Sequence, residues 1–294
     1  MPTPKTVQLF LLNGTPTGPI KCSLSNWTGR VFLVPRTNLK PLSKQRPDLS
    51  HNGVYLLFGS EEATDREMVY VGQARSRANG NGIAGRIDEH STDRLSYFTH
   101  AIIITTTDDS FGPTEISYLE NNLWKAALEA ERYKIANNNT PSPGNVTEEK
   151  QAELDEFIEY TKIAVGSLGY KVFQPLDETA TPPLRDDTSN TVEKENTSTL
   201  FFKGQNFHAR GKQTADGFVI LKDSTIRAES APSCPPSRES YVEKFADSLE
   251  DFRLTKDILF RSPSTAAVFV SGRSSNGLKE WKSFEGVPLK ELEL

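Results

Sequence analysis

Short apolar runs and longer stretches with helical spacing alternate along the first 176 residues. The runs at 6–12, 20–25, 53–58, 68–71 and 98–107 are rich in β-branched and aromatic residues and predict strands. The short polar link between 53–58 and 68–71 favours an antiparallel hairpin. Between residues 25 and 42, apolar and basic residues mix, and a short helix capped by Ser25 or Asn26 is expected there.

Helical spacing is clearest over residues 114–134, where we expect Thr114 to cap a helix. Its apolar stripe consists of Ile116, Leu119, Leu123, Ala127 and Ala130. Glu120 lies beside this stripe, where a carboxylate is costly unless a cation, a metal or a hydrogen-bond donor meets it. Further helices are predicted over 83–94 and 147–165, and a closing strand over 170–176.

The second half of the chain begins a separate pattern after a polar interval. Residues 177–197 contain proline and almost no large apolar side chains, which indicates a linker. Strand-like runs resume at residue 200, followed by a helix capped by Ser237, a helix capped by Ser262 or Ser264, an Asn-Gly turn and an anchoring Trp281. We therefore expect a mixed α/β fold, of the α+β kind in which the sheets are mainly antiparallel. It would comprise an N-terminal hairpin extension (1–50), a core domain (51–176), the linker and a small α+β accessory domain (198–294).

Composition narrows the classes of function. Of 294 residues, 36% are hydrophobic and 25% charged, as in soluble globular proteins, and no apolar run approaches a membrane span. Lone cysteines at positions 22 and 234 and the absence of a signal-peptide pattern favour a cytoplasmic, reducing environment. The net charge of −5 argues against coating nucleic acid through bulk charge but permits a local basic groove.

One compact stretch carries a set of residues suited to phosphodiester hydrolysis. A carboxylate such as Glu120 can hold one Mg²⁺ ion, and Arg86 can grip phosphate oxygens. Tyr55 or Tyr70, near positive charge, can take a proton from water, and His90 can relay that proton. Each residue alone has an ordinary structural explanation, so the interpretation depends on their occurrence in order within one stretch.

Residues 50–140 resemble the GIY-YIG nucleases. The Gly-Val-Tyr triplet at 53–55 and the Tyr-Val-Gly triplet at 70–72 match the two signature motifs. Arg86 matches the family's helical arginine, Glu120 its metal-binding glutamate, and His90 the histidine of the restriction-enzyme branch. The resemblance implies a three-stranded, mainly antiparallel sheet flanked by helices. It also implies an endonuclease that uses Mg²⁺ or Mn²⁺ and acts on nucleic acid, with DNA as the expected partner.

Two positions depart from the family pattern. Gln73 stands where excision-repair members often have lysine, and the family's asparagine falls late, within residues 137–139. We expect Gln73, Arg75, Arg77 and Asn137 to contact the substrate. The departures motivate an alternative, in which the chain is a weak or inactive nucleic-acid-binding or interaction module that retains the nuclease fold.

The C-terminal part resembles a small domain of unassigned function that occurs behind such nuclease domains. The segment at 262–277 and the following Trp281 carry this similarity. Arg273, Lys279 and Lys282 are candidate phosphate contacts, with a solvated turn as the other interpretation.

A rival interpretation starts from Gly80, Gly82 and Gly85, which spell G-x-G-x-x-G. The first glycine lies well past the preceding strand, and the next helix is too polar to pack on a doubly wound sheet. A nucleotide-binding fold is therefore disfavoured.

Overall fold

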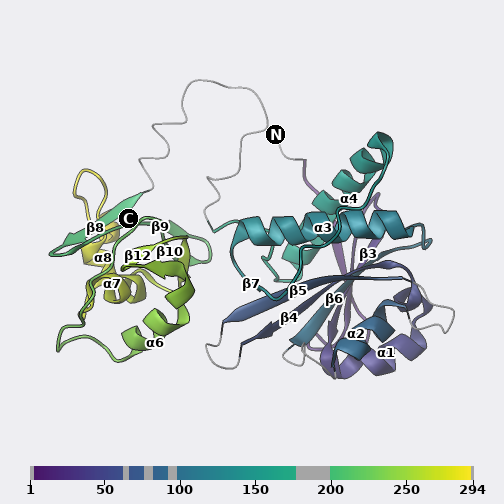
Figure 1. Ribbon diagram of the computed structural model, residues 1–294, viewed down its shortest axis with the longest axis horizontal. Helices are drawn as coiled ribbons and strands as arrows, with labels where there is room; N and C mark the ends of the chain where they lie inside the picture. Colours follow the sequence, from purple (N-terminus) through teal and green to yellow (C-terminus); the bar gives the residue numbers. More distant parts are fainter. Residues whose placement is uncertain (1–2, 62–65, 76–81, 92–97, 177–198, 293–294) are drawn as a thin grey trace. The chain divides into compact units, whose positions relative to one another are not determined.

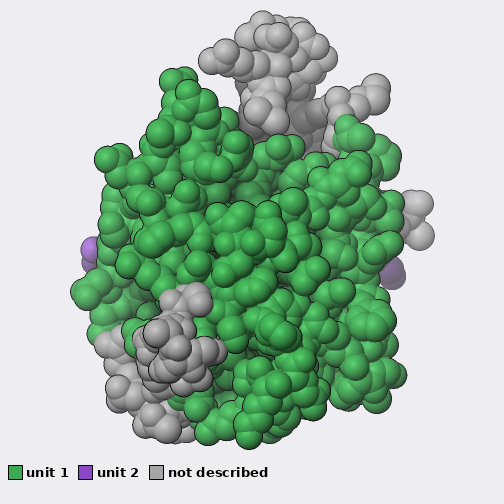
Figure 2. Space-filling model, turned by 90° about the vertical axis from the view of Figure 1, so that its right-hand side faces the viewer, with its two compact units in different colours: residues 1–174 green, residues 175–294 purple. Residues whose placement is uncertain are grey.

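The computed structural model describes residues 3–61, 66–75, 82–91, 98–176 and 199–292, with side chains at all of these except 89–91. The chain forms two compact units, residues 1–174 and 175–294, which Figure 2 colours separately. Both units mix helices with largely antiparallel sheets, so the predicted α+β class is confirmed. The expected linker at 177–197 lies outside the described residues. None of the helices traced in the structure is both long and apolar enough to cross a membrane.

The first unit is built on a seven-stranded sheet in the order β1-β2-β3-β6-β4-β5-β7. All neighbours pair antiparallel except β5 and β7, which are parallel. Its strands are β1 (Val7–Leu11), β2 (Ile20–Leu24), β3 (Gly29–Pro35), β4 (Gly53–Ser60), β5 (Glu67–Ala74), β6 (Phe98–Thr106) and β7 (Lys134–Ile135). The sheet is wider than the three strands expected, because β3 pairs with β6 and so joins the N-terminal strands to the centre.

Two local predictions were wrong. Residues 29–35 form β3 and not part of a short helix, because the segment pairs with β2 and β6 and buries Val31, Phe32 and Val34 in the cores on the two faces of the sheet. The helix comes later, as α1 (Leu39–Gln45) between the 3-10 turns η1 (Arg36–Asn38) and η2 (Pro47–Ser50). Residues 170–176 form turns and not a closing strand, although Val172 is buried in the core.

Helices cover both faces of this sheet (Figure 1). Side chains alternate along β4, so Val54 and Leu56 belong to the core beneath α3 (Pro113–Ala130) and α4 (Glu148–Ser167). Tyr55 and Leu57 belong to the opposite core, beneath α1 and α2 (Ile83–Ser91). Two small cores therefore share one sheet.

Helix α3 has the predicted buried stripe but different ends. Its N-cap is Gly112, followed by Pro113 at the first helical position, and not Thr114. It ends at Ala130, where Glu131 adopts a left-handed conformation. The next residues join β5 as β7 instead of extending the helix. The buried stripe residues are Ile116, Leu119, Leu123, Ala127 and Ala130.

The second unit is organised around a four-stranded antiparallel sheet in the order β13-β10-β9-β8. Its strands are β8 (Leu200–Gly204), β9 (Phe207–Thr214), β10 (Gly217–Ile220) and β13 (Ile258–Phe260), with a separate pair β11 (Leu249–Glu250) and β12 (Arg253–Leu254). Its helices are α6 (Ser237–Lys244), η4 (Ala246–Ser248), α7 (Pro263–Ser271), α8 (Gly277–Glu280) and α9 (Leu289–Leu292).

Trp281 is fully buried and packs against Phe202 and Phe218, as an anchoring residue should. The N-cap residue of α6 is Pro236 and not the predicted Ser237, which is the first residue of the helix.

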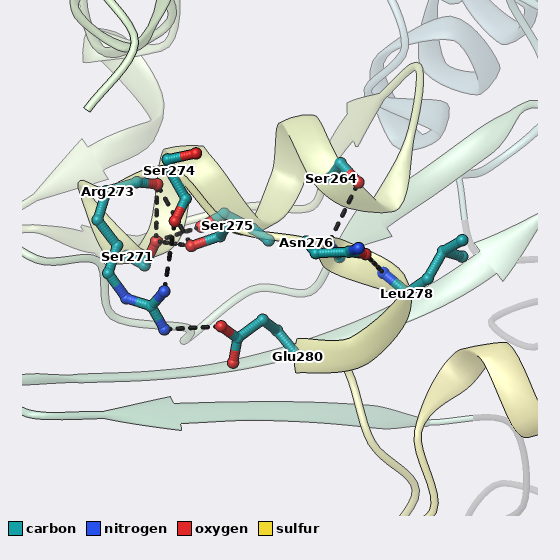
Figure 3. Close-up of polar contacts among 10 residues, drawn as sticks. Ser264, Ser271, Arg273, Ser274, Ser275, Asn276, Leu278 and Glu280 are labelled. Atoms are coloured by element: carbon teal, nitrogen blue, oxygen red, sulfur yellow. Dashed lines mark hydrogen bonds and ion pairs between the residues drawn. The ribbon is translucent and has the colours of Figure 1, made fainter. Parts of the chain in front are cut away.

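Hydrogen bonds from side chains in and next to the connection between α7 and α8 fix its conformation (Figure 3). The hydroxyl of Ser264 accepts a hydrogen bond from the backbone N–H of Gly277 at 3.1 Å. A Cβ at Gly277 would lie 2.2 Å from the backbone of Pro263, so only glycine fits this close approach. The side chain of Asn276 caps α8 by accepting the N–H of Leu278.

Candidate functional site

The two signature triplets pack against each other across the β4–β5 hairpin. Tyr55 is paired with Gly72 on the neighbouring strand. A Cβ at Gly72 would lie 2.5 Å from Cζ of Tyr55, so the tyrosine ring occupies the space that a side chain would need. The rings of Tyr55 and Tyr70 lie 6.2 Å apart, centre to centre. The glycine of the second triplet is thus required by the tyrosine of the first.

Helix α2 brings Arg86 to the hydroxyl end of Tyr55. Arg86 hydrogen-bonds to this side chain, which is only 1% exposed. Burial raises the pKa of the Tyr55 hydroxyl, and neighbouring Tyr70 and Glu120 act in the same direction, while Arg86 opposes them. The net shift of the Tyr55 pKa is upward, so the hydroxyl is protonated at neutral pH and can donate a hydrogen bond.

Glu120 reaches the site from α3, on the other side of the sheet. Its carboxylate oxygen Oε2 accepts a hydrogen bond from Nε2 of Gln73 at 2.9 Å. The Gln73 amide is held in turn by the hydroxyl of Ser117, 3.1 Å from Nε2 and 3.2 Å from Oε1. The donor that a buried carboxylate needs is therefore Gln73, at the position where the GIY-YIG resemblance leads one to expect lysine.

The open edge of β5 explains how groups from the two sides of the sheet meet. Strand β7 covers this edge at Val69. The Asn137 amide then accepts the N–H of Val71 at 3.0 Å and donates to its carbonyl at 2.8 Å, as a neighbouring strand would. Two residues further along β5, the backbone N–H of Gln73 hydrogen-bonds to the Glu120 carboxylate. Beyond β7, side chains take over the role of a paired strand.

The electrostatics of Glu120 suit a cation. Burial raises the pKa of its carboxyl to about 7, while the side-chain and backbone N–H groups of Gln73 lower it. Within the described part of the chain, no group of three or more His, Cys, Asp or Glu side chains could hold a metal ion. A single carboxylate is a donor set that fits Mg²⁺ or Mn²⁺ with water completing the coordination, and not a zinc site.

The structure places most of the predicted site residues. It brings together the side chains of Tyr55, Tyr70, Gln73, Arg86 and Glu120. His90 lies one turn beyond Arg86 in α2, and its side chain is not among those described. Arg75 is exposed just after β5, and Arg77 falls outside the described residues. Asn137 bonds to the backbone of Val71.

Ser117 is a site residue that the sequence did not suggest. It lies about one turn before Glu120 on α3, and its hydroxyl also donates to the carbonyl of Pro113 at 3.0 Å. The spacing of three residues places both side chains on one helix face, which is the only local signal of their link.

The candidate cations of the second unit differ in environment. Arg273 forms an ion pair with Glu280 at 2.8 Å (Figure 3). Lys279 and Lys282 are exposed.

Comparison with known protein families finds a match in the second unit. A family model described as "Domain of unknown function (DUF4357)" matches residues 200–293. This agrees with the domain of unassigned function expected at the C-terminus. The chain has no match among the curated proteins or the solved structures. The GIY-YIG resemblance of the first unit therefore stays a prediction.

Proposed function

We propose that this chain is a divalent-metal-dependent endonuclease that hydrolyses phosphodiester bonds in DNA. The observation that carries the proposal is the convergence of Tyr55, Tyr70, Arg86 and Glu120 from four separate elements. The antiparallel order β6-β4-β5 at the centre of the sheet, with α2 and α3 on opposite faces, supports the proposal. The additional strands lie outside this central group.

The protein groups have distinct roles in the proposed reaction. Arg86 would bind phosphate oxygens while it orients the Tyr55 hydroxyl. A divalent cation held by Glu120 would neutralise charge on the phosphate and lower the pKa of the attacking water. Tyr55 would accept the proton of the attacking water as a phenolate, a form that nearby positive charge would favour by lowering the raised pKa of this side chain. The half-buried Tyr70 and the histidine one turn after Arg86 are the groups through which the proton would leave.

Plasmid nicking tests this proposal directly. Supercoiled plasmid incubated with the protein and Mg²⁺ or Mn²⁺ should be converted to the open-circular form. Glu120→Gln should reduce the rate at least about a hundredfold. Glu129→Gln, on an exposed position of the same helix, is the matched control and should leave it unchanged. Absence of nicking, or equal nicking by Glu120→Gln, contradicts the proposal.

A second candidate follows from the Gln73 contact. Because Gln73 already satisfies Glu120, the first unit could serve as a nucleic-acid-binding module without turnover. Salt-dependent DNA binding that is indifferent to Glu120→Gln, without cleavage in Mg²⁺ or Mn²⁺, would support this function.

A further inference from the structure

One face of the second unit's sheet carries a row of aromatic and basic residues that are exposed or partly exposed. In the β8–β9 pair, Phe201 lies opposite Arg210 and Lys203 opposite His208. Because side chains alternate along a strand, these four share one face. The intervening residues, such as Phe202, point into the core. Figure 1 locates the two strands.

A segment after α8 extends this face. Lys282 pairs with Phe201 through two backbone hydrogen bonds, of 2.7 and 3.0 Å, so its side chain lies on the same side as Phe201. The ring of Phe284 lies 6.2 Å from that of Phe201, centre to centre, and 83% of the Phe284 residue is exposed. On the other side of Phe201, the His208 ring lies 6.5 Å away and nearly parallel, at 11°. We call this set the aromatic-basic face: Phe201, Lys203, His208, Arg210, Lys282 and Phe284.

The cations of this face are not neutralised locally. Lys203, Arg210 and Lys282 form no ion pair with any residue that the structure describes, and Arg210 donates instead to the carbonyl of Lys222 at 3.1 Å. Partial burial lowers the pKa of His208, and the charges of Lys203 and Arg210 lower it further. A chain with a net charge of −5 thus places three cations beside aromatic rings on this face.

We propose that the aromatic-basic face binds single-stranded nucleic acid, DNA or RNA. The rings would stack on unpaired bases, and the three cations would contact the phosphates that link them. Stacking distinguishes this partner from a duplex, whose base faces are covered. The match in charge comes from Lys203, Arg210 and Lys282. The proposal does not rest on cleavage by the first unit, and it uses none of that unit's residues.

Fluorescence anisotropy on the full chain tests the stacking. The protein carries Glu120→Gln and the buffer contains EDTA, so that binding is measured without cleavage. The probes are a labelled 20-nucleotide DNA strand, the RNA of the same sequence and the corresponding DNA duplex. We expect tighter binding to at least one single strand than to the duplex. Phe284→Leu should weaken single-strand binding about five- to hundredfold, whereas Phe252→Leu, at a 46% exposed position of the same unit, should not.

The salt dependence of binding tests the cations. Lys282→Gln keeps the backbone pairing with Phe201 and should reduce the slope of log affinity against log salt by about 0.7. Lys290→Gln, at an exposed position on α9, is the control and should leave the slope unchanged. Loss of single-strand binding in Phe284→Leu supports the proposal even where the wild-type chain fails to nick plasmid.

Three results would overturn the proposal. The first is that neither single strand binds. The second is that the duplex binds as tightly as the single strands and that Phe284→Leu changes neither affinity. The third is that phosphatidylserine vesicles bind through the same residues and displace the strand.

Discussion

The contact between Tyr55 and Gly72 shows how a short motif can be a packing unit. Gly72→Ala would place a Cβ against the tyrosine ring, which is buried and cannot move freely. We expect this variant to be destabilised by about 1–3 kcal/mol and to lose cleavage activity, because the Tyr55 hydroxyl shifts from Arg86.

Urea unfolding measures the first effect of Gly72→Ala. Gly166→Ala is the control, since Gly166 lies within α4 and faces only the flexible end of Gln174. Alanine there should be neutral or stabilising. An unchanged free energy of unfolding for Gly72→Ala would show that the Tyr55 ring can adopt another position without cost.

The ionisation of Glu120 couples stability to pH. Its folded-state pKa, about 7, is above the ordinary value of 4.5, so the folded state binds the proton more tightly than the unfolded state does. The group therefore stabilises the fold least above pH 7, and its unfavourable contribution grows as pH rises from 4.5 to 7. Glu120→Gln should become more stable relative to wild type over this range, by up to about 3 kcal/mol. Thermal unfolding at several pH values measures the difference.

Metal binding should reverse this dependence on pH. Mg²⁺ competes with the proton for the Glu120 carboxylate, so it should raise Tm more at pH 8 than at pH 5.5. Glu120→Gln should lose this response, and Glu129→Gln should keep it. A response to Mg²⁺ that is equal in both variants would place the ion elsewhere.

At the scale of elements, the edge of β5 is completed by a side chain. Asn137→Ala would remove the two hydrogen bonds to Val71 and leave its N–H and carbonyl without these partners. We expect a loss of about 1–3 kcal/mol and faster amide hydrogen exchange at Val71. Asn138→Ala, at an exposed position, is the control. Unchanged exchange at Val71 would instead favour the predicted substrate contact for Asn137.

At the scale of the whole molecule, the two units have separate cores. Trp281 is buried among Phe202, Phe218 and other residues of the second unit. Trp281→Ala should destabilise this unit by about 3–5 kcal/mol and leave the first unit's transition unchanged. Leu123→Ala, in the core of the first unit, should do the reverse. Calorimetry that resolves the two transitions tests this, and a common shift of both would show that the units unfold together.

Local patterns predicted the central elements of the first unit. The strands β4, β5 and β6 and the helix α3 were expected near their observed positions, because strand and helix periods are properties of consecutive side chains. The same reasoning identified Glu120 as a buried carboxylate in need of a partner. The errors at 29–35 and 170–176 arose where burial by distant segments decided the backbone.

Residue types and their order were enough to propose the chemistry, since each side chain brings the same functional group wherever it lies. Their meeting depends on tertiary structure. Gln73 contacts Glu120, and Asn137 takes the place of a strand, only because β5 has an open edge that α3 and the segment after β7 can both reach. The aromatic-basic face likewise forms when Lys282 pairs with Phe201, which lies far away along the chain. No local pattern encodes such pairings, because their stability comes from backbone groups of segments that meet only in the folded protein.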